Sequence, residues 1–232
     1  KEAKVNVSNA TKLRMGGVVG YAASTVSGCV NNAAITINCP STDDGTHTYA
    51  GGVVGRNGGQ VSDSDNTATI TVTAGCLAQR IGGIVGQNYD SDIEGCENSG
   101  EIICNDVVVK KVRYYGGIVG YSTGTVSSCT NTATVSTAKM SSVSSEADYT
   151  SNVLGGIAGY FAGTSVTLCE NTGTISNNYY CNSTSYDTAP HTGGIVGHAK
   201  GTSSARISVS SCEVITSKNS KLSSKRGWIG GV

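Results

Sequence analysis

The sequence has little of several residue types that common fold classes need. Its 232 residues include two Pro, one Trp and one Phe, and only 14% are charged. This composition excludes a helical bundle and a highly charged disordered tail. No apolar run approaches the roughly 20 residues that cross a bilayer. The 16 acidic and 16 basic residues leave no net charge, so the basic footprint of a nucleic-acid-binding protein is missing.

Glycine is abundant, with 32 residues, and much of it lies in one recurring motif. The motif Gly-Gly-Ile/Val-Val/Ala-Gly starts near residues 16, 51, 82, 116, 155 and 193, and a partial copy starts at 230. Intervals of 31–39 residues are typical of a solenoid, in which each repeat packs on its neighbours. We therefore expect residues 1–232 to form a single β-helical repeat domain. Neither end carries an obvious polar cap, so we expect a fragment of a longer repeat protein.

A second landmark near the middle of each repeat aligns the repeats further. This landmark is a column of five cysteines and one serine: Cys29, Ser64, Cys96, Cys129, Cys169 and Cys212. Two residues later follows a column of asparagines: Asn31, Asn66, Asn98, Asn131 and Asn171. Small residues and then Ile or Val follow at further steps of two, with Thr-rich polar partners between them. This period of two predicts half-buried strands rather than helices.

Each repeat offers three short strand candidates, at the glycine motif, at the cysteine column and at the final Ile or Val. Three strands and their corners within one repeat fit a turn of a parallel β-helix. We predict an all-β, right-handed parallel β-helix of about six rungs, with handedness from the crossover rule. The asparagines would then form a hydrogen-bonded ladder near a buried corner. A propeller is the alternative, but its blades need four antiparallel strands.

An apolar stripe precedes the last glycine of each motif. Its members are Val19, Val54, Val85, Val119, Ala158 and Val196. In each motif the residue before the stripe residue is also Ile or Val. Alternation points these two side chains to opposite faces of the strand. Strands that are apolar on both faces usually have both faces covered. We hypothesise that the variable connections, or another molecule, cover the stripe.

The nine cysteines allow more than one interpretation. Five lie in the landmark column and four lie further along their repeats: Cys39, Cys76, Cys104 and Cys181. An odd count leaves at least one thiol unpaired, and Cys29 faces Ser64 in the next repeat. We therefore favour small buried hydrophobic residues for the column, while a bridge such as Cys39–Cys76 stays open. No Cys-x-x-Cys pair is present, so we expect no metal, and we expect no cofactor.

An aromatic row follows the glycine motif in adjacent repeats, at Tyr121, Tyr160 and His198. Such rings can stack on sugars, so this trio is the best ligand-binding candidate, although aromatic ladders also stabilise sheets. Carboxylates follow the cysteine column at Asp65, Glu97, Glu170 and Glu213. Paired carboxylates could serve a glycosidase or a lyase, but no Lys or Arg cluster accompanies them. We expect no catalytic residues.

Two charged clusters favour ordinary surface roles. Lys110, Lys111 and Arg113 lie together in a variable connection, where we expect a solvated loop. Asn88, Asp90, Asp92 and Glu94 alternate oxygen ligands as a calcium loop does. They lack the glycine and the glutamate spacing of an EF-hand, so we expect a polar turn.

The repeat at residues 116–135 closely resembles the GLUG-type repeat of bacterial surface and secreted proteins. That family has Gly-Gly-Leu-Val-Gly, a polar turn with Gly, an Ile, and a polar segment leading to a small residue and Val. Here the motif reads Gly-Gly-Ile-Val-Gly-Tyr-Ser-Thr-Gly-Thr-Val, and Cys and Asn occupy the polar segment. The resemblance covers nearly the whole chain. It implies an extracellular repeat region attached to adhesins or to large secreted enzymes, and it supplies no catalytic residues.

We therefore expect a non-catalytic extracellular module of a cell surface that acts as a spacer, an adhesin or a filament-forming subunit. Its expected partners are copies of itself, bound end to end or laterally, or neighbouring repeats of a longer chain, with glycans as a further candidate. We expect no nucleic acid and no membrane span in this segment. The alternative is a carbohydrate-binding or carbohydrate-cleaving β-helix. A lower-ranked alternative is an ice-binding face at Thr69, Thr71, Thr134 and Thr174, which Glu101 and Ile103 interrupt.

Overall fold

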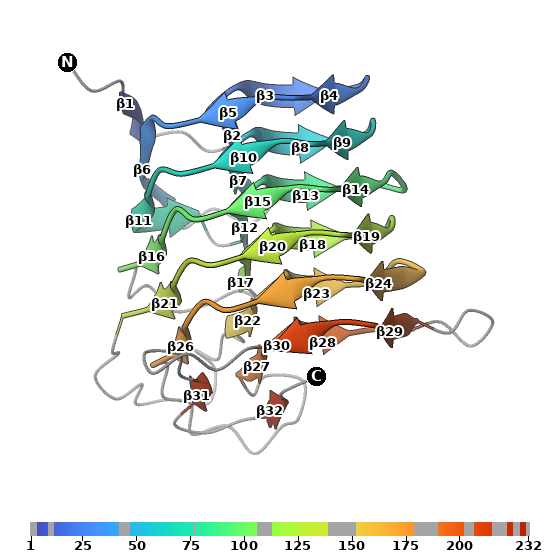
Figure 1. Cartoon of the computed structure of the whole chain (residues 1–232). Helices are drawn as coiled ribbons and strands as arrows, with labels where there is room; N and C mark the ends of the chain where they lie inside the picture. The colour runs from blue at the N-terminus through green and yellow to red at the C-terminus, as the bar shows by residue number, and fades with distance from the viewer. Residues whose placement is uncertain are drawn as a thin grey trace.

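The protein is a parallel β-solenoid. The computed structural model describes residues 4–8, 12–41, 47–76, 78–105, 113–138, 152–178, 190–201, 207–214, 222–224 and 228–230. Figure 1 shows windings stacked along one axis, and strands at equivalent positions of successive windings pair in parallel. Within the described ranges no helix is long and apolar enough to cross a membrane. The predicted all-β parallel solenoid is confirmed.

Five parallel sheets run along the stack, and each is named here after its strand in the first full winding. The β2 sheet contains β2 (Lys12–Gly16), β7 (His47–Gly51), β12 (Ala78–Gly82), β17 (Arg113–Gly116), β22 (Asn152–Gly155), β27 (His191–Gly193) and β32 (Trp228–Gly230). The β3 sheet contains β3 (Val19–Ala22), β8 (Val54–Asn57), β13 (Val85–Asn88), β18 (Val119–Ser122), β23 (Ala158–Phe161) and β28 (Val196–Ala199).

The other three sheets complete each winding. The β4 sheet contains β4 (Val26–Ser27), β9 (Val61–Ser62), β14 (Ile93–Glu94), β19 (Val126–Ser127), β24 (Ser165–Thr167) and β29 (Ser208–Ser210). The β5 sheet contains β5 (Val30–Asn31), β10 (Asp65–Asn66), β15 (Glu97–Asn98), β20 (Thr130–Asn131), β25 (Glu170–Asn171) and β30 (Glu213–Val214). The β6 sheet contains β1 (Lys4–Ser8), β6 (Ala34–Ser41), β11 (Ile70–Cys76), β16 (Ile102–Cys104), β21 (Val135–Thr137), β26 (Ile175–Asn177) and β31 (Leu222–Ser224).

The prediction of three strands per rung is wrong. A winding such as residues 12–41 contributes one strand to each of the five sheets. Short bends divide the segments that alternation alone suggested as single strands, including one that begins at the second glycine of the pair. From residue 190 onward the windings are described only in part, so the count of about six rungs stays a prediction.

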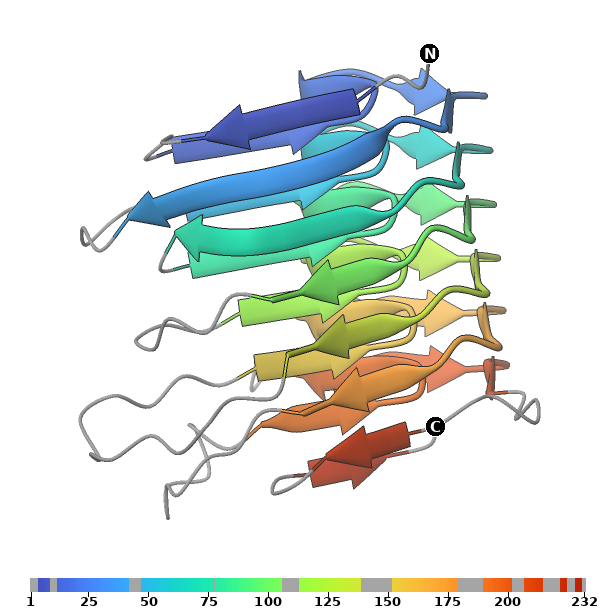
Figure 2. The same ribbon diagram turned by 90° about the vertical axis from the view of Figure 1, so that its left-hand side faces the viewer.

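Two apolar cores fill the solenoid. The first gathers side chains of the β3 and β4 sheets and of the cysteine column, such as Val54, Ile93 and Cys129. The second lies between the β2 and β6 sheets, which lie one behind the other in Figure 2, and includes Met15 and Ile35. Strand alternation produces this second core, because every other residue of β2 is buried and the residues between are exposed.

The glycine motif forms a corner between two strands. β2 ends at Gly16 and β3 begins at Val19, with a bend between them. In the next winding, a Cβ on Gly52 would clash with the carbonyl oxygen of Gly83 and with the side chain of Asn66. Only glycine therefore allows the windings to approach this closely at the corner.

The hypothesis of a covered outer stripe is wrong. The members Val54, Val85, Val119 and Ala158 are all 0% exposed and belong to the first core. Because the chain turns at the glycine pair, Val53 and its neighbour Val54 both point inward, and both are 0% exposed. The stripe is part of the interior and offers no lateral docking surface.

Candidate functional site

The asparagine column forms a ladder of side-chain amides inside the corner. The Nδ2 atom of Asn31 donates to Oδ1 of Asn66 at 2.8 Å. The same bond joins Asn66 to Asn98, Asn98 to Asn131, and Asn131 to Asn171, at 2.8, 2.9 and 2.8 Å. Each ladder residue is at most 3% exposed. The ladder is therefore closed to ligands and satisfies polar groups between the windings.

A second, shorter ladder lies at the end of the β3-sheet strands. Asn57 Nδ2 donates to Asn88 Oδ1 at 2.7 Å, and Asn88 Nδ2 donates to Ser122 Oγ at 3.0 Å. All three residues are 0% exposed. Sequence reasoning missed this ladder, because only two of its members are asparagine. Asn88 therefore does not belong to a solvated turn as expected, whereas Asp90 and Glu94 of that segment are exposed.

The cysteine column consists of free thiols. Cys29, Cys96, Cys129, Cys169 and Cys212 are all unbridged, and the middle three are at most 1% exposed. Thiols donate to the carbonyl two residues earlier, as from Cys129 to Ser127 at 3.1 Å, and the Ser64 hydroxyl makes the equivalent bond to Ser62 at 2.8 Å. Contacts with the Cys169 and Cys96 thiols, together with burial, raise the pKa of the Cys129 thiol well above 9.0.

The suggested bridge between Cys39 and Cys76 is wrong. Cys39 is a free, buried thiol, and the strand register places Cys76 opposite Ser41. The remaining cysteine of this group in the described part, Cys104, is also free and contacts the hydroxyl of Tyr115 at 3.0 Å. Cys181 lies outside the described residues.

Arginines and tyrosines alternate on the outer side of the β2 and β3 sheets. Register aligns Arg14, Tyr49, Arg80, Tyr114, Val153 and His191 along the β2 sheet. It aligns Tyr21, Arg56, Gln87, Tyr121, Tyr160 and His198 along the β3 sheet. We call these two columns, with Tyr89, the arginine–tyrosine face.

The guanidinium groups of this face lie over tyrosine rings. The Arg80 Cζ atom is 4.1 Å from the centroid of the Tyr121 ring and 5.4 Å from that of Tyr49. Arg56 lies 4.8 Å from the ring centroid of Tyr89 and 5.9 Å from that of Tyr21. These are cation–π distances. They connect the two sheets, since Arg80 belongs to the β2 sheet and Tyr121 to the β3 sheet.

The structure brings the predicted aromatic trio together. Tyr121 and Tyr160 stack with ring centroids 5.3 Å apart and an interplanar angle of 10°. Tyr160 and His198 follow at 4.9 Å. Tyr114 of the neighbouring sheet adds a further ring, 4.7 Å from Tyr160. Sequence reasoning missed Tyr114, because local spacing does not reveal that two sheets approach each other here.

Tyr114, Tyr121 and Tyr160 form the aromatic end of the face, and their phenol groups stay neutral at ordinary pH. Burial, with a smaller contribution from Tyr160, raises the pKa of Tyr114 from 10.0 to about 12. Burial also raises the pKa of Tyr121 and of Tyr160, against the opposing effect of the Arg80 charge. The rings therefore offer faces and hydroxyl groups rather than negative charge.

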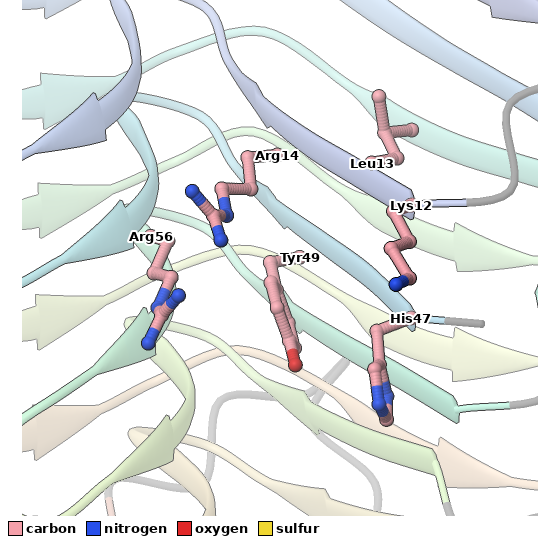
Figure 3. A pocket seen from close by; sticks show the side chains of 6 residues that line it. All are labelled: Lys12, Leu13, Arg14, His47, Tyr49 and Arg56. Carbon is pink, nitrogen blue, oxygen red and sulfur yellow. The ribbon is translucent and has the colours of Figure 1, made fainter. Parts of the chain in front are cut away.

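A hollow of about 280 Å³ opens at the end of the arginine–tyrosine face that carries Lys12, Arg14 and Arg56, which we call its cationic end. It is lined by Lys12, Leu13, Arg14, His47, Tyr49 and Arg56. Figure 3 shows the Tyr49 ring between Arg56 on one side and His47 on the other. The strands of the β2 and β3 sheets contain no Asp or Glu, so no carboxylate on these strands neutralises the three cations.

Three buried polar atoms of the β3 column, in two side chains, lack hydrogen-bond partners within the described part of the chain. Gln87 is 0% exposed, and neither its Nε2 nor its Oε1 atom is paired. The Nε atom of Arg56, which lies opposite Gln87 in the register, is also buried and unpaired. Such atoms are rare in native proteins and call for an explanation.

The predicted carboxylates lie in a different sheet. Asp65 pairs with Glu97, and Glu170 with Glu213, along the β5 sheet. This sheet lies in front of the β3 sheet in Figure 1, so the carboxylates do not join the tyrosines. Across the ranges that the structure describes, no group of three or more His, Cys, Asp or Glu residues could hold a metal ion.

The structure also bears on the basic cluster near Arg113 and on the threonine face. The prediction of a solvated loop is wrong for Arg113, which lies in β17 and is only 2% exposed; Lys110 and Lys111 lie outside the described residues. On the β6 sheet, Thr71 aligns with Thr36 on one side and with Ile103 on the other. The threonine face is therefore interrupted at Ile103.

Comparison with known families identifies the repeat. Three segments, residues 46–71, 78–103 and 113–136, match the model of the GLUG motif. Each segment begins at or just before a β2-sheet strand and ends in or beside a β6-sheet strand, so one motif covers most of one winding. Searches of curated proteins and of solved structures found no match to this chain. The chain therefore contains a GLUG-type repeat region, folded as a parallel β-solenoid.

Proposed function

We propose that this chain is a non-catalytic extracellular repeat module that acts as a structural spacer and adhesin of a cell surface. The observation that carries the proposal is the coupling of each winding to the next through two continuous cores and the asparagine ladder. Such coupling produces an elongated scaffold on which one face is repeated at regular intervals. The GLUG motif favours the extracellular setting.

The placement of the acidic residues supports a non-catalytic role. A glycosidase needs two carboxyl groups on opposite sides of one glycosidic bond. Asp65 and Glu97 lie instead in adjacent parallel strands at the same register position, so they occupy one face of the sheet. A carbohydrate-binding role without cleavage fits the arginine–tyrosine face better.

Self-association belongs to the same proposal in a narrower form. Lateral docking through the valine stripe is excluded, because that stripe is buried. End-to-end contact stays part of the proposal, since the terminal winding of a solenoid presents unpaired strand edges. We also propose the right-handed winding of about six rungs, for which the crossover rule gives the support.

Protease shaving of intact source cells tests the proposal. Brief treatment should release peptides of this chain before any cytoplasmic marker appears. Recovery of these peptides only after cell lysis would contradict the surface location.

A second experiment tests the non-catalytic role. Incubation of the purified chain with polygalacturonate and dextran should release no new reducing ends. A release that scales with protein concentration would contradict this role.

A further inference from the structure

We propose that the arginine–tyrosine face binds a linear anionic polysaccharide, a chain of sugars with carboxylate or sulfate groups, that runs along the solenoid axis. This inference rests on the proposed adhesive role and names the class of ligand for that role. It places acid groups at the cationic end of the face and sugar rings at the aromatic end.

The first support is charge. Lys12, Arg14 and Arg56 all line one hollow, and no strand of the two sheets that carry them contains a carboxylate. Like charges held close together repel unless an anion lies between them. A guanidinium group matches a carboxylate or a sulfate through two parallel hydrogen bonds. The hollow is thus complementary to an anionic group.

The second support is the unpaired polar atoms beside the hollow. Arg56 Nε and both amide atoms of Gln87 have no hydrogen-bond partner among the described residues. A buried group without a partner costs free energy. An anionic or hydroxyl-bearing ligand that contacts Arg56 can supply the missing acceptor. Gln87 is 0% exposed, so Arg56, which lines the hollow, is the residue of this pair that a ligand contacts.

The third support is periodicity. Arg14, Arg56 and Arg80 come from three successive windings, and successive windings are about 4.8 Å apart. Arg14 and Arg80 belong to the β2 column with Tyr49 between them, and Arg56 belongs to the β3 column. The cations therefore form a staggered line along the axis, with one arginine in each of the three windings. A linear polymer with regularly spaced acid groups matches such a line, whereas a single small anion would use only one position.

The fourth support is the aromatic end, which favours sugar over other polyanions. Beyond Arg80, the line continues as the stacked rings of Tyr121 and Tyr160. Both side chains are partly exposed. Aromatic faces pack against the apolar faces of sugar rings while the phenol hydroxyl remains available for hydrogen bonds. The neutral overall charge of the chain also makes nucleic acid a poor fit.

Titration calorimetry on the whole 232-residue chain tests the proposal with matched polymers. Dextran sulfate and polygalacturonate are the anionic glycans, dextran is the neutral control, and polyphosphate is a polyanion without sugar. We expect binding of at least one anionic glycan, no detectable binding of dextran, and weakening of the interaction with added salt. Absence of binding by both anionic glycans would overturn the proposal.

Paired variants locate the site. Arg56→Gln with Arg80→Gln should weaken glycan binding by about tenfold or more, because a hydrogen bond to a charged group is commonly worth that much. The control, Lys4→Gln with Lys200→Gln, removes the same charge from other exposed positions and should change affinity by about twofold or less. Equal losses in the two double variants would show nonspecific attraction and overturn the site.

A further variant separates sugar from charge. Tyr160→Ser should weaken binding of the anionic glycan and leave polyphosphate binding unchanged. If polyphosphate binds as tightly as the glycan and Tyr160→Ser affects neither, the face is a general polyanion site and the proposal fails. Circular dichroism of each variant checks that the fold is retained.

Footprinting of the unmodified chain keeps the test independent of variant folding. Acetylation of Lys12 should fall severalfold when the anionic glycan is present, while acetylation of Lys4 and Lys200 should not change. Equal protection of all three lysines would overturn the site. None of these measurements depends on where the protein lies in the cell. A negative calorimetry result therefore contradicts the glycan site alone, and a negative shaving result contradicts the surface role alone.

Discussion

The side-chain amide of Asn66 donates to the Oδ1 atom of Asn98, 2.8 Å away in the next winding. The same Asn66 nitrogen also reaches the carbonyl oxygen of Ala68 at 2.9 Å. Asn98 repeats both bonds, to Asn131 and to Gly100. Each asparagine thus joins its own turn to the winding beyond it. This arrangement explains why a buried polar column is compatible with two apolar cores.

Replacement of one ladder residue should destabilise the solenoid strongly. Asn98→Ala removes one of the two acceptors of the Asn66 amide nitrogen and the Asn98 donor to the Asn131 oxygen. We expect a loss of about 3 kcal/mol in the free energy of unfolding, because two buried groups each lose a partner. Urea denaturation measures the loss. Asn32→Ala is the control, since Asn32 is exposed, and it should change stability by about 0.5 kcal/mol or less. Similar losses for both variants would argue against the ladder.

Glycine at the corner should be irreplaceable. A Cβ on Gly117 would clash with the carbonyl oxygen of Gly156 and with the Asn131 side chain. Gly117→Ala should therefore cost about 3 kcal/mol or more, because backbone must shift to make room. Gly58→Ala provides the control: its nearest contact is an ordinary one, Ala22 O at 3.8 Å, and we expect a change within about 1 kcal/mol. Thermal unfolding followed by circular dichroism compares them, and an unchanged midpoint for Gly117→Ala would refute the close approach.

The thiols of the cysteine column should be protected by burial rather than by disulfides. Cys129 is 0% exposed and its pKa is raised, so its reactive thiolate form is scarce in the native state. We expect Cys129 to react with a disulfide reagent at least about tenfold more slowly than the partly exposed Cys29, and to react fully after denaturation. Mass spectrometry assigns the labelled positions. An unfolding midpoint that drops when a reductant is added would instead indicate bridges.

Stability should decline in alkaline solution. The pKa of Tyr114 is raised from 10.0 to about 12 in the folded state. A raised folded pKa means that the contribution is complete below pH 10 and is lost as the pH rises towards 12. Because Tyr114 is only partly buried, we expect this loss to be about 1–2 kcal/mol. Urea denaturation across this pH range measures it.

Tyr114→Phe is the matched variant for the alkaline prediction. It should remove part of the decline, while Tyr121 and Tyr160, whose pKa values are raised in the same direction, retain the rest. A decline of equal size in the variant would show that Tyr114 does not hold its proton in the folded state. Ultraviolet absorbance of tyrosinate gives an independent titration.

The aromatic trio illustrates what could be predicted about the site. Tyr121, Tyr160 and His198 occupy the same offset from the glycine motif, so their stacking follows from the repeat alone. The arginines over the rings were not foreseen. Arg80 and Tyr121 are distant in sequence and belong to different sheets, and strand alternation gives no information about which sheets approach each other.

The sequence by itself determined the vertical order of this protein. Equivalent residues recur at one offset per repeat, and parallel pairing at constant register places them above one another, as with Asn66 and Asn98. The tertiary structure alone decided how each winding closes. Five strands rather than three, inward-facing Val54 and buried Arg113 all depend on where the backbone bends and which surfaces then meet. Alternation defines the two faces of a strand, but only packing between distant segments decides which face becomes the interior.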